Sequence, residues 1–161
     1  MASRMPPECA QNVSMTQPPP SPIHDSDRDW VKAQIDEYVS TDGAKPVFRQ
    51  GAPLVLITTQ GRKSGEWRRT CLIGASDGAD VVVVASMGGA PKHPSWYFNL
   101  ECNPRVWVQQ GAETFWAVAH TADATEKPRL WDKMVGLYSD YATYQTKTDR
   151  DIPVVVLVRE S

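Results

Sequence analysis

The sequence predicts an α+β protein built around a small antiparallel β-barrel with flanking helices. Six candidate strands follow residue 50, and two pairs of them are joined by short turn-forming segments. Only three segments have the periodicity or the boundary residues of helices. A length of 161 residues with 41% hydrophobic residues suits one domain with a real core. Strands with hairpin spacing and few helices favour a barrel over a layered α/β fold.

Proline sets the first 26 residues apart from the rest of the chain. Pro6, Pro7 and the run 18–20 lie among small polar residues. Proline has no N–H to donate and fixes φ, so this stretch holds neither a helix nor a strand ladder well. We therefore expect a disordered leader at 1–26 and a single folded domain at 27–161.

An amphipathic helix is predicted over residues 27–41, with an aspartate available to cap its start. Val31, Ile35 and Val39 share one face, and a glycine follows the helix. Such a stripe favours packing on the body of the domain. An amphipathic helix with an exposed tryptophan also suits a membrane surface, so a peripheral membrane contact through 27–42 remains an alternative.

Six segments have the length and composition of β-strands. The third is a continuous run of valines, which indicates burial on both faces. Gly78 supplies a hairpin turn before it, and Gly111 joins the fourth strand to the fifth. The six segments span residues 54–59, 69–75, 81–86, 105–110, 114–120 and 152–158.

Two further helices are predicted between the strands. The first, at 95–103, follows Pro94 and stops before another proline. The second, at 125–138, has Pro128 in its first turns and an apolar stripe along one face.

Charge and composition exclude several classes of function. A net charge of −2 argues against a general nucleic-acid-binding protein, because such proteins carry a large basic excess. No apolar run approaches the length that spans a bilayer, and no secretion signal is recognisable. Three widely spaced cysteines indicate reduced thiols, which favours a cytoplasmic protein.

Common catalytic motifs are missing as well. The sequence lacks the G-x-S-x-G of hydrolases, the H-E-x-x-H of metalloproteases and the G-x-G-x-x-G of Rossmann domains. No spacing of histidines and carboxylates suggests a metal site.

A basic, glycine-flanked turn follows the first strand, with the sequence Gly61-Arg62-Lys63-Ser64-Gly65. Its glycines allow a sharp turn in which several N–H groups converge on one anion. Arg62, Lys63 and the Ser64 hydroxyl add charge and donors, and Arg68 follows on the next strand. The alternative is a basic turn exposed to solvent.

A glycine-rich loop and an aromatic helix follow the valine strand. The glycine pair 88–89 lets backbone approach a ligand, and Lys92 precedes a helix start that favours an anion. Trp96 and Tyr97 can line the edge of a planar ligand. A hydrophobic helix that closes one end of the barrel is an equal alternative.

Tyr138, Tyr141 and Tyr144 are spaced i, i+3 and i+6, so on one helix they would share nearly one face. They can form the wall of a pocket and offer hydroxyl donors, although an ordinary core-facing stripe is equally compatible. Two anion-friendly loops beside an aromatic cavity would suit a phosphorylated ring cofactor.

In combination, these segments resemble the deazaflavin-dependent nitroreductase family of actinobacteria. The resemblance implies a split β-barrel related to the FMN-binding barrels, and a domain at 27–161 that binds coenzyme F420, an 8-hydroxy-5-deazaflavin. The segments that carry it are 53–65, 91–100, 103–104, 141–145 and 148–154.

The resemblance also assigns roles to individual residues. Residues expected to hold the phosphate end of the cofactor are Arg62, Lys63, Ser64, Gly65 and Arg68. Residues expected beside the deazaflavin ring or at the helix start are Val84, Ala85, Ser86, Met87, Lys92, Ser95, Trp96, Tyr97, Phe98, Asn99 and Tyr141. Tyr141 and Ser86 are the expected catalytic proton donors, and Tyr138, Tyr144 and Trp96 would line the substrate pocket.

The chain departs from the family pattern at four positions. Met87 stands where relatives commonly have lysine, and Lys92 is a candidate to compensate. Trp67 replaces a frequent proline, Phe98 replaces histidine, and Ile73 replaces an aromatic residue of some nitro-reducing relatives. These differences bear on the substrate more than on the cofactor.

The expected activity is hydride transfer from reduced F420 to a small apolar acceptor, such as a quinone, an activated enone or a nitro compound. The alternatives are an FMN-dependent oxidoreductase of the same barrel and a non-catalytic protein that binds the deazaflavin or a lipophilic ligand. The sequence does not decide between these acceptors.

Overall fold

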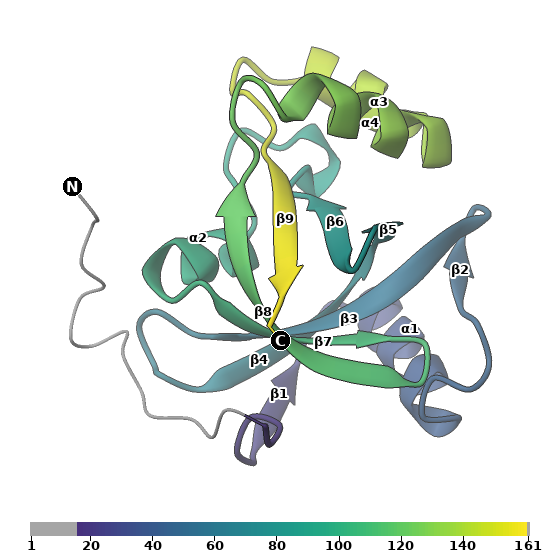
Figure 1. Cartoon of the computed structure of the whole chain (residues 1–161), viewed down its shortest axis with the longest axis vertical. Coiled ribbons are helices and arrows are strands. Elements are labelled where there is room, and N and C mark those ends of the chain that lie inside the picture. The colour runs from purple at the N-terminus through teal and green to yellow at the C-terminus, as the bar shows by residue number, and fades with distance from the viewer. Residues whose placement is uncertain (1–15, 161) are drawn as a thin grey trace.

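The computed structural model describes residues 16–160, and within them the chain forms an α+β fold (Figure 1). A nine-stranded sheet curls around its own core, and four α-helices flank it. The strands are β1 Ile23–Asp25, β2 Phe48–Arg49, β3 Ala52–Gln60, β4 Trp67–Ile73, β5 Ala75–Asp77, β6 Asp80–Val84, β7 Arg105–Gln110, β8 Glu113–Thr121 and β9 Val154–Arg159. The helices are α1 Asp29–Ser40, α2 Ser95–Cys102, α3 Lys127–Leu137 and α4 Asp140–Thr146, with a short 3-10 turn, η2, at Met87–Gly89.

The strand order explains how the sheet becomes a split barrel. The order is β1-β4-β3-β7-β8-β9-β6-β5, with β2 paired to β3, and only the β1–β4 pairing is parallel. A single residue, Gly74, joins β4 near one end of this order to β5 at the other, so the chain closes the barrel there. A Cβ on Gly74 would lie 2.6 Å from a methyl of Val55, which is why the bend requires glycine. The predicted α+β split barrel is confirmed.

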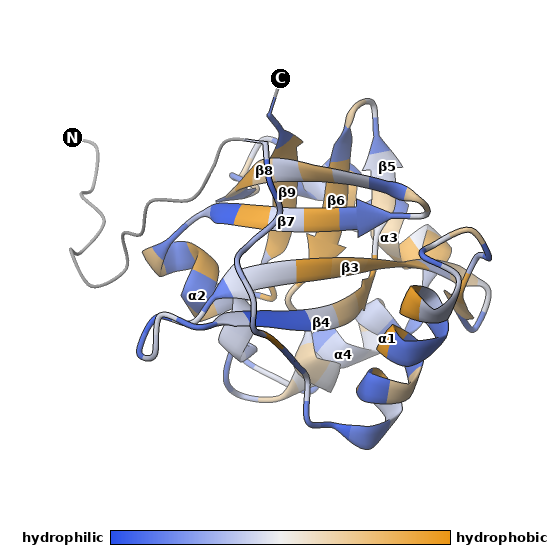
Figure 2. Cartoon of the chain, turned by 90° about the horizontal axis from the view of Figure 1, so that it is seen from below, coloured by the Kyte–Doolittle hydropathy of each residue, from blue (hydrophilic) through white to orange (hydrophobic). Residues whose placement is uncertain are grey.

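Alternate residues of the strands face two separate cores. One core contains Val55 and Ile57 of β3 with Trp96 and Leu100 of α2. The other lies under α1, α3 and α4 on the opposite face. The valines of β6 are divided between the two cores and are all buried, so the predicted burial on both faces is confirmed. Figure 2 shows these apolar strands together with a hydrophilic stretch in β4.

Helix α1 packs its apolar stripe on the sheet, as expected. Val31, Ile35 and Tyr38 are buried, whereas Val39 is 41% exposed because the buried face is centred one residue earlier. No side chain caps the helix: Arg28 occupies the N-cap position without a side-chain hydrogen bond. The predicted aspartate cap is therefore wrong.

The segment before α1 differs from the predicted leader. Residues 1–15 lie outside the described range, but β1 belongs to the sheet and pairs with β4. Asp25 forms a two-point ion pair with Arg69 at 2.6 and 3.0 Å, and the Trp116 indole donates to the Gln17 carbonyl at 2.7 Å. Disorder is therefore the wrong prediction for residues 23–25, where sheet pairing outweighs the proline-rich composition.

The predicted helix at 125–138 is confirmed as α3, but the tyrosine stripe extends beyond it. Tyr138 is extended (φ −146°, ψ 93°), so α3 stops at Leu137 and α4 begins after a short turn. The three tyrosines thus come from two helices and the junction between them, and the prediction of one shared helix is wrong. They nevertheless lie together, as described below.

Two findings bear on the predictions about membrane spans and cysteine redox state. In the described part of the chain, no helix is long and apolar enough to cross a membrane. Cys71 is a buried free thiol, whereas Cys102 is disulfide-bonded. The expectation of reduced thiols is wrong at Cys102, because sequence spacing alone does not show which cysteines find a partner.

Candidate functional site

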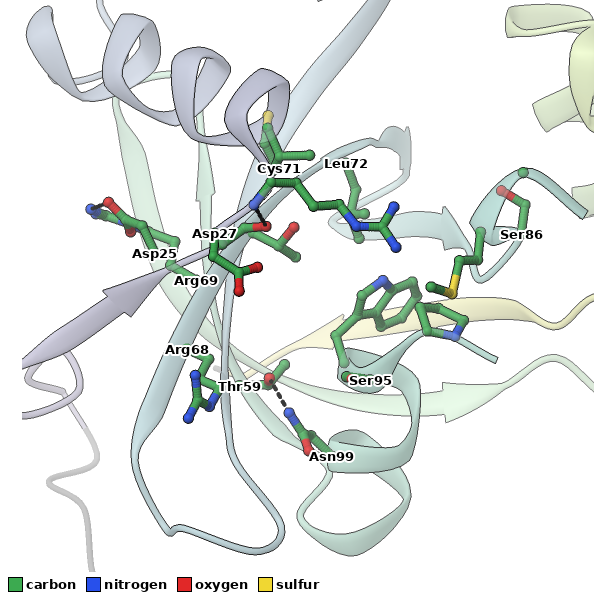
Figure 3. A pocket seen from close by; sticks show the side chains of 18 of the residues that line it. Asp25, Asp27, Thr59, Arg68, Arg69, Cys71, Leu72, Ser86, Ser95 and Asn99 are labelled. Atoms are coloured by element: carbon green, nitrogen blue, oxygen red, sulfur yellow. Dashed lines mark hydrogen bonds and ion pairs between the residues drawn. The ribbon is translucent and has the colours of Figure 1, made fainter. Parts of the chain in front are cut away.

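A cavity of about 670 Å³ opens beside strand β4 of the split barrel. Strand β4 lines one side of it, and the end of β6, the η2 turn and the start of α2 line another. Figure 3 shows Ser86 across this space from Arg69 and Cys71, with Ser95 and Asn99 below them on α2. The first turn of α1 and the α3–α4 junction complete the wall.

The predicted basic turn lies at one end of the cavity and is fixed to α2. The Arg62 backbone N–H and Nη1 both donate to Oδ1 of Asn99, at 3.2 and 2.9 Å. Asn99 is buried and donates in turn to the Thr59 hydroxyl at 3.2 Å. This network connects the turn, the end of β3 and α2, so the orientation of Arg62 is set before any ligand arrives.

The turn closes on itself through its backbone. Gly61 donates to the Glu66 carbonyl at 2.7 Å, and Gly65 donates to the Gly61 carbonyl at 2.9 Å. The Ser64 hydroxyl accepts from the Glu66 N–H at 3.1 Å. Lys63 projects into solvent with no ion-pair partner among the described residues, which leaves its ammonium available to an anion.

Positive charge is concentrated around this cavity although the whole chain is slightly acidic. Asp25 is occupied by Arg69, and Arg68 pairs at 3.3 Å with Glu66, about half exposed at the surface. The lining carries more arginine and lysine side chains than carboxylates, so an anionic ligand is favoured there. The cations are Arg28, Arg49, Arg62, Lys63, Arg68 and Arg69, and the carboxylates are Asp25 and Asp27.

A second loop, residues 85–90, is held by an arginine that the sequence interpretation left without a role. Arg150 donates to the carbonyls of Ala85 at 3.1 Å, Ser86 at 2.6 Å and Ala90 at 2.7 Å. Its guanidinium also contacts Nδ1 of His93 at 2.9 Å. Arg150 therefore fixes the backbone from the end of β6 to the approach of α2, including the position of Ser86.

Close packing joins this loop to α4. Gly89 has φ +82°, and a Cβ there would lie 2.6 Å from the Tyr144 carbonyl oxygen. Met87, at φ 46°, turns its side chain outward to 39% exposure at the cavity rim. Gly89 thus allows α4 to approach the loop and brings the tyrosines to the cavity.

The three tyrosines form an aromatic wall of the cavity. The ring centroid of Tyr138 lies 5.0 Å from that of Tyr141 and 6.2 Å from that of Tyr144, and the hydroxyls of Tyr138 and Tyr144 are 3.0 Å apart. Burial raises the pKa of Tyr141, with Arg49 opposing the rise, and burial and the Tyr144 contact raise the pKa of Tyr138. The phenols of Tyr138 and Tyr141 therefore remain neutral donors near neutral pH.

Two hydroxyls in the lining are free to bind a ligand. Neither Ser86 Oγ nor the Tyr141 hydroxyl forms a hydrogen bond with another described residue, although both side chains are largely buried and line the cavity. The Ser86 backbone, in contrast, is fixed by Arg150. Unpaired donors on a fixed frame are well suited to orient a polar atom of a bound molecule.

The structure brings most of the predicted site residues to this one cavity. Those in the lining are Arg62, Lys63, Ser64, Arg68, Val84, Ser86, Met87, Ser95, Trp96, Asn99, Tyr138, Tyr141 and Tyr144. Those outside it are Gly65, Ala85, Lys92, Tyr97 and Phe98.

The residues outside the lining have other surroundings. Tyr97 points into the barrel core and its hydroxyl lies 2.7 Å from the Thr121 hydroxyl. Phe98 packs under the guanidinium of Arg62, 5.2 Å from ring centroid to Cζ. Lys92 is exposed. Both alternatives for this helix therefore hold in part. Tyr97 and Leu100 belong to the barrel core, while Ser95, Trp96 and Asn99 line the cavity.

Sequence reasoning missed several residues of the lining. Arg49 reaches the cavity from β2, and Asp25 and Asp27 reach it because β1 pairs with β4. Each stands alone in a short or irregular segment, so no local pattern marked it.

Burial raises the pKa of the Cys71 thiol to about 12, so this thiol is un-ionised.

The lining fits a phosphorylated planar cofactor of the F420 type. Arg62 and Lys63 offer fixed and free positive charge for a phosphate, while Trp96 and the aromatic wall offer surfaces for a ring system. The residues present would hold the phosphate at the basic turn and the ring between α2 and the η2 turn.

Comparison with known proteins gives consistent matches. A family model described as F420H(2)-dependent quinone reductase matches residues 30–159. An F420H(2)-dependent quinone reductase of Mycobacterium tuberculosis is 39% identical over 126 residues, which cover 76% of this chain and 85% of that protein. A solved structure of an F420-H2 dependent reductase, FDR-A, is 45% identical, with a TM-score of 0.61, covering 65% of this chain and 92% of the other. Another, described as a domain-swapped dimer, is 39% identical, with a TM-score of 0.64, covering 82% and 99%.

Proposed function

Since this chain belongs to the F420H(2)-dependent quinone reductase family, we propose that the cavity beside β4 is where it reduces quinones with F420H2. The observation that carries the proposal is the fixed Arg62–Asn99 network, which holds a cation at the entrance of an aromatic cavity. Arg62, Lys63 and Arg68 would bind the phosphate of the cofactor. Val84, Ser86 and Met87 would lie along its ring, and Ser95, Trp96 and Asn99 would contact it from α2.

Reduction of a quinone to a quinol requires one hydride and one proton. Reduced deazaflavin, when bound, supplies the hydride as one two-electron unit. The protein holds the acceptor against the ring and excludes water, which needs no side-chain nucleophile. The buried aromatic wall at Tyr138, Tyr141 and Tyr144 provides this dry surface.

Tyr141 and Ser86 are proposed as the hydroxyls that orient the acceptor oxygen. Burial keeps the pKa of Tyr141 high, so it holds its proton and donates a hydrogen bond instead of ionising. A group with a high pKa is a weak acid, so we assign the last proton to solvent and the hydrogen bond to Tyr141. The Tyr138–Tyr144 pair and Trp96 would shape the pocket around the rest of the acceptor.

We further propose a peripheral membrane contact beside the cavity. The apolar stripe of α1 is buried, so the contact would use other residues: Trp30 and Phe48, which are 53% and 56% exposed. Trp30 also lines the cavity, so an apolar quinone could pass from lipid to the site. Flotation with liposomes tests this: the Trp30→Ser, Phe48→Ser double variant should remain in the soluble fraction while the parent floats.

The activity itself is tested with purified protein and F420H2. Oxidation of the cofactor, followed by its absorbance, should depend on both protein and quinone, and a panel with enones and nitroaromatics would establish the acceptor range. FMN binding is the matched comparison. Tight binding of FMN without binding of F420, or F420 binding without turnover of any quinone, would overturn the proposed function.

A further inference from the structure

Arg49 occupies a fixed position on the side of the cavity formed by α1. Its Nη2 donates to Oε1 of Gln34 at 2.7 Å, and its Cζ lies 4.5 Å from the ring centroid of Trp30. Both contacts are with residues of α1, so they hold the guanidinium against that helix. Arg49 is therefore held in place although it belongs to a two-residue strand.

The charge of Arg49 is not compensated by the surrounding protein. Within residues 16–160, no carboxylate lies within ion-pair distance of it, and its Nε is buried without an acceptor. Arg69 of the same lining, in contrast, is neutralised by Asp25 at 2.6 Å. Arg62 keeps its charge, because its partner at 2.9 Å is the neutral side-chain amide of Asn99. An uncompensated positive charge in a cavity lining favours a ligand that presents a negatively charged atom to it.

The guanidinium acts on the aromatic side of the cavity, away from the basic turn. Its positive charge works against the rise in the pKa of both Tyr141 and Cys71, which places it within electrostatic reach of the two side chains. Arg62 and Lys63, in contrast, belong to the α2 side. The lining thus carries positive charge on its α1 side, at Arg49, as well as at the basic turn beside α2.

We propose that Arg49 binds the acceptor oxygen that becomes negatively charged during reduction. The proposal rests on the proposed function and extends it to substrate specificity. Hydride addition would turn the quinone into a quinol monoanion, whose charge lies on oxygen, and a proton from solvent would complete the quinol. Oxidation of the cofactor would yield the hydride and one proton, and that proton would pass to solvent, so the reaction balances. The neutral hydroxyls of Tyr141 and Ser86 donate hydrogen bonds, while Arg49 supplies the opposite charge.

A stable mimic of the quinol anion tests the contact without turnover. The probe is 2-hydroxy-1,4-naphthoquinone, which is anionic at neutral pH, and 2-methyl-1,4-naphthoquinone is its neutral counterpart. Binding to the protein loaded with oxidised F420 is measured by calorimetry. Arg49→Gln should weaken the anionic probe about 10- to 100-fold, as for a charged hydrogen bond, and change the neutral one less than about threefold. Equal effects on both probes, or none, would overturn the proposal.

Cofactor affinity separates this role from a second phosphate site. In Arg49→Gln the dissociation constant of F420 should stay within about twofold of the parent, while kcat/KM for quinones falls about as much as anion binding. A weaker F420 affinity with unchanged probe binding would assign Arg49 to the cofactor instead. Arg129→Gln, which removes a surface arginine paired with Asp77, is the matched charge control and should change neither value.

A charge-conserving variant keeps the proposal testable if Arg49→Gln does not fold. Arg49→Lys keeps the charge but loses the planar fork, so it should retain anion binding within about tenfold of the parent. Loss of both probes in a folded Arg49→Lys would overturn the proposal. If the parent binds the anionic probe through Arg49 but reduces no quinone, the proposed function fails while the anion site stands.

Discussion

The Arg150 guanidinium donates a hydrogen bond to Nδ1 of His93 at 2.9 Å. Arginine has donors only, so Nδ1 must accept and the imidazole must be neutral, with its proton on Nε2. The same guanidinium holds three carbonyls of the loop that carries Ser86. The protonation state of His93 is therefore linked to the backbone of the candidate site.

This pair predicts a loss of stability in mildly acidic solution. Burial and the charge of Arg150 lower the pKa of His93 below its ordinary 6.5. The unfolded chain then binds more protons between the two pKa values, so the free energy of unfolding should fall as pH drops below about 6.5 and level off below the folded pKa. His93→Gln keeps an acceptor that does not titrate and should lose less stability over that range. Urea denaturation from pH 8 to 5 measures it, and parallel profiles would contradict the linkage.

Removal of the free ammonium at the basic turn should weaken cofactor binding. Lys63→Ala is expected to reduce F420 affinity by about 1.5–3 kcal/mol, the value for a hydrogen bond to a charged group, and less at high salt because the side chain is exposed. Fluorescence titration at two salt concentrations measures the effect. Lys133→Ala, on the opposite side of the molecule at Asp77, is the control. An unchanged dissociation constant for Lys63→Ala would remove the anchor role from this turn.

Two neighbouring glycines give a matched pair for the packing of α4. Gly88 and Gly89 both have positive φ, but a Cβ on Gly88 meets nothing within 4 Å, whereas one on Gly89 meets the Tyr144 carbonyl at 2.6 Å. Gly88→Ala should cost about 1 kcal/mol of stability for its backbone conformation alone. Gly89→Ala should cost more and also raise KM for quinones, because α4 must move. Equal thermal denaturation and equal kinetics would show that the close approach is unimportant.

Loss of one phenol should affect the acceptor and spare the cofactor. Tyr144→Phe removes the 3.0 Å contact with the Tyr138 hydroxyl, so Tyr138 can reorient within the pocket. We expect kcat/KM to change by about three- to tenfold, differently for different quinones, as for a neutral hydrogen bond. Affinity for F420 should be unchanged. The control is Tyr38→Phe, which loses a hydroxyl contact to Gln109 outside the cavity and should reduce stability only.

Hydrophobic periodicity was sufficient to predict the larger elements. The valine run became β6, the 105–110 and 114–120 segments became the β7–β8 hairpin, and the stripe from Val31 became α1. Each has enough residues for its period to stand out. Strands β1 and β2 escaped notice because two or three residues show no period, and their pairing depends on distant partners at β4 and β3.

The site residues also fall into those that a local sequence pattern predicts and those that it does not. The basic turn and the tyrosines were predicted because glycines or aromatic residues cluster in sequence. Arg49 and Arg150 were given no role, because each acts through contacts far along the chain: Arg49 with Trp30, and Arg150 with carbonyls at 85–90. The end of α3 near Tyr138 was predicted, but the separate helix α4 was not, since the i, i+3 spacing of the tyrosines continues across the extended residue.

Strand β1 has a consequence for handling the protein. It covers the outer edge of β4 by pairing Ile23 with Trp67 and Asp25 with Arg69. A chain shortened to residue 27 would expose these backbone donors and acceptors beside a buried tryptophan, and would free the guanidinium of Arg69. Exposed edges recruit strands from other molecules. Trimming the proline-rich start would therefore promote aggregation, even though composition alone marks that segment as dispensable.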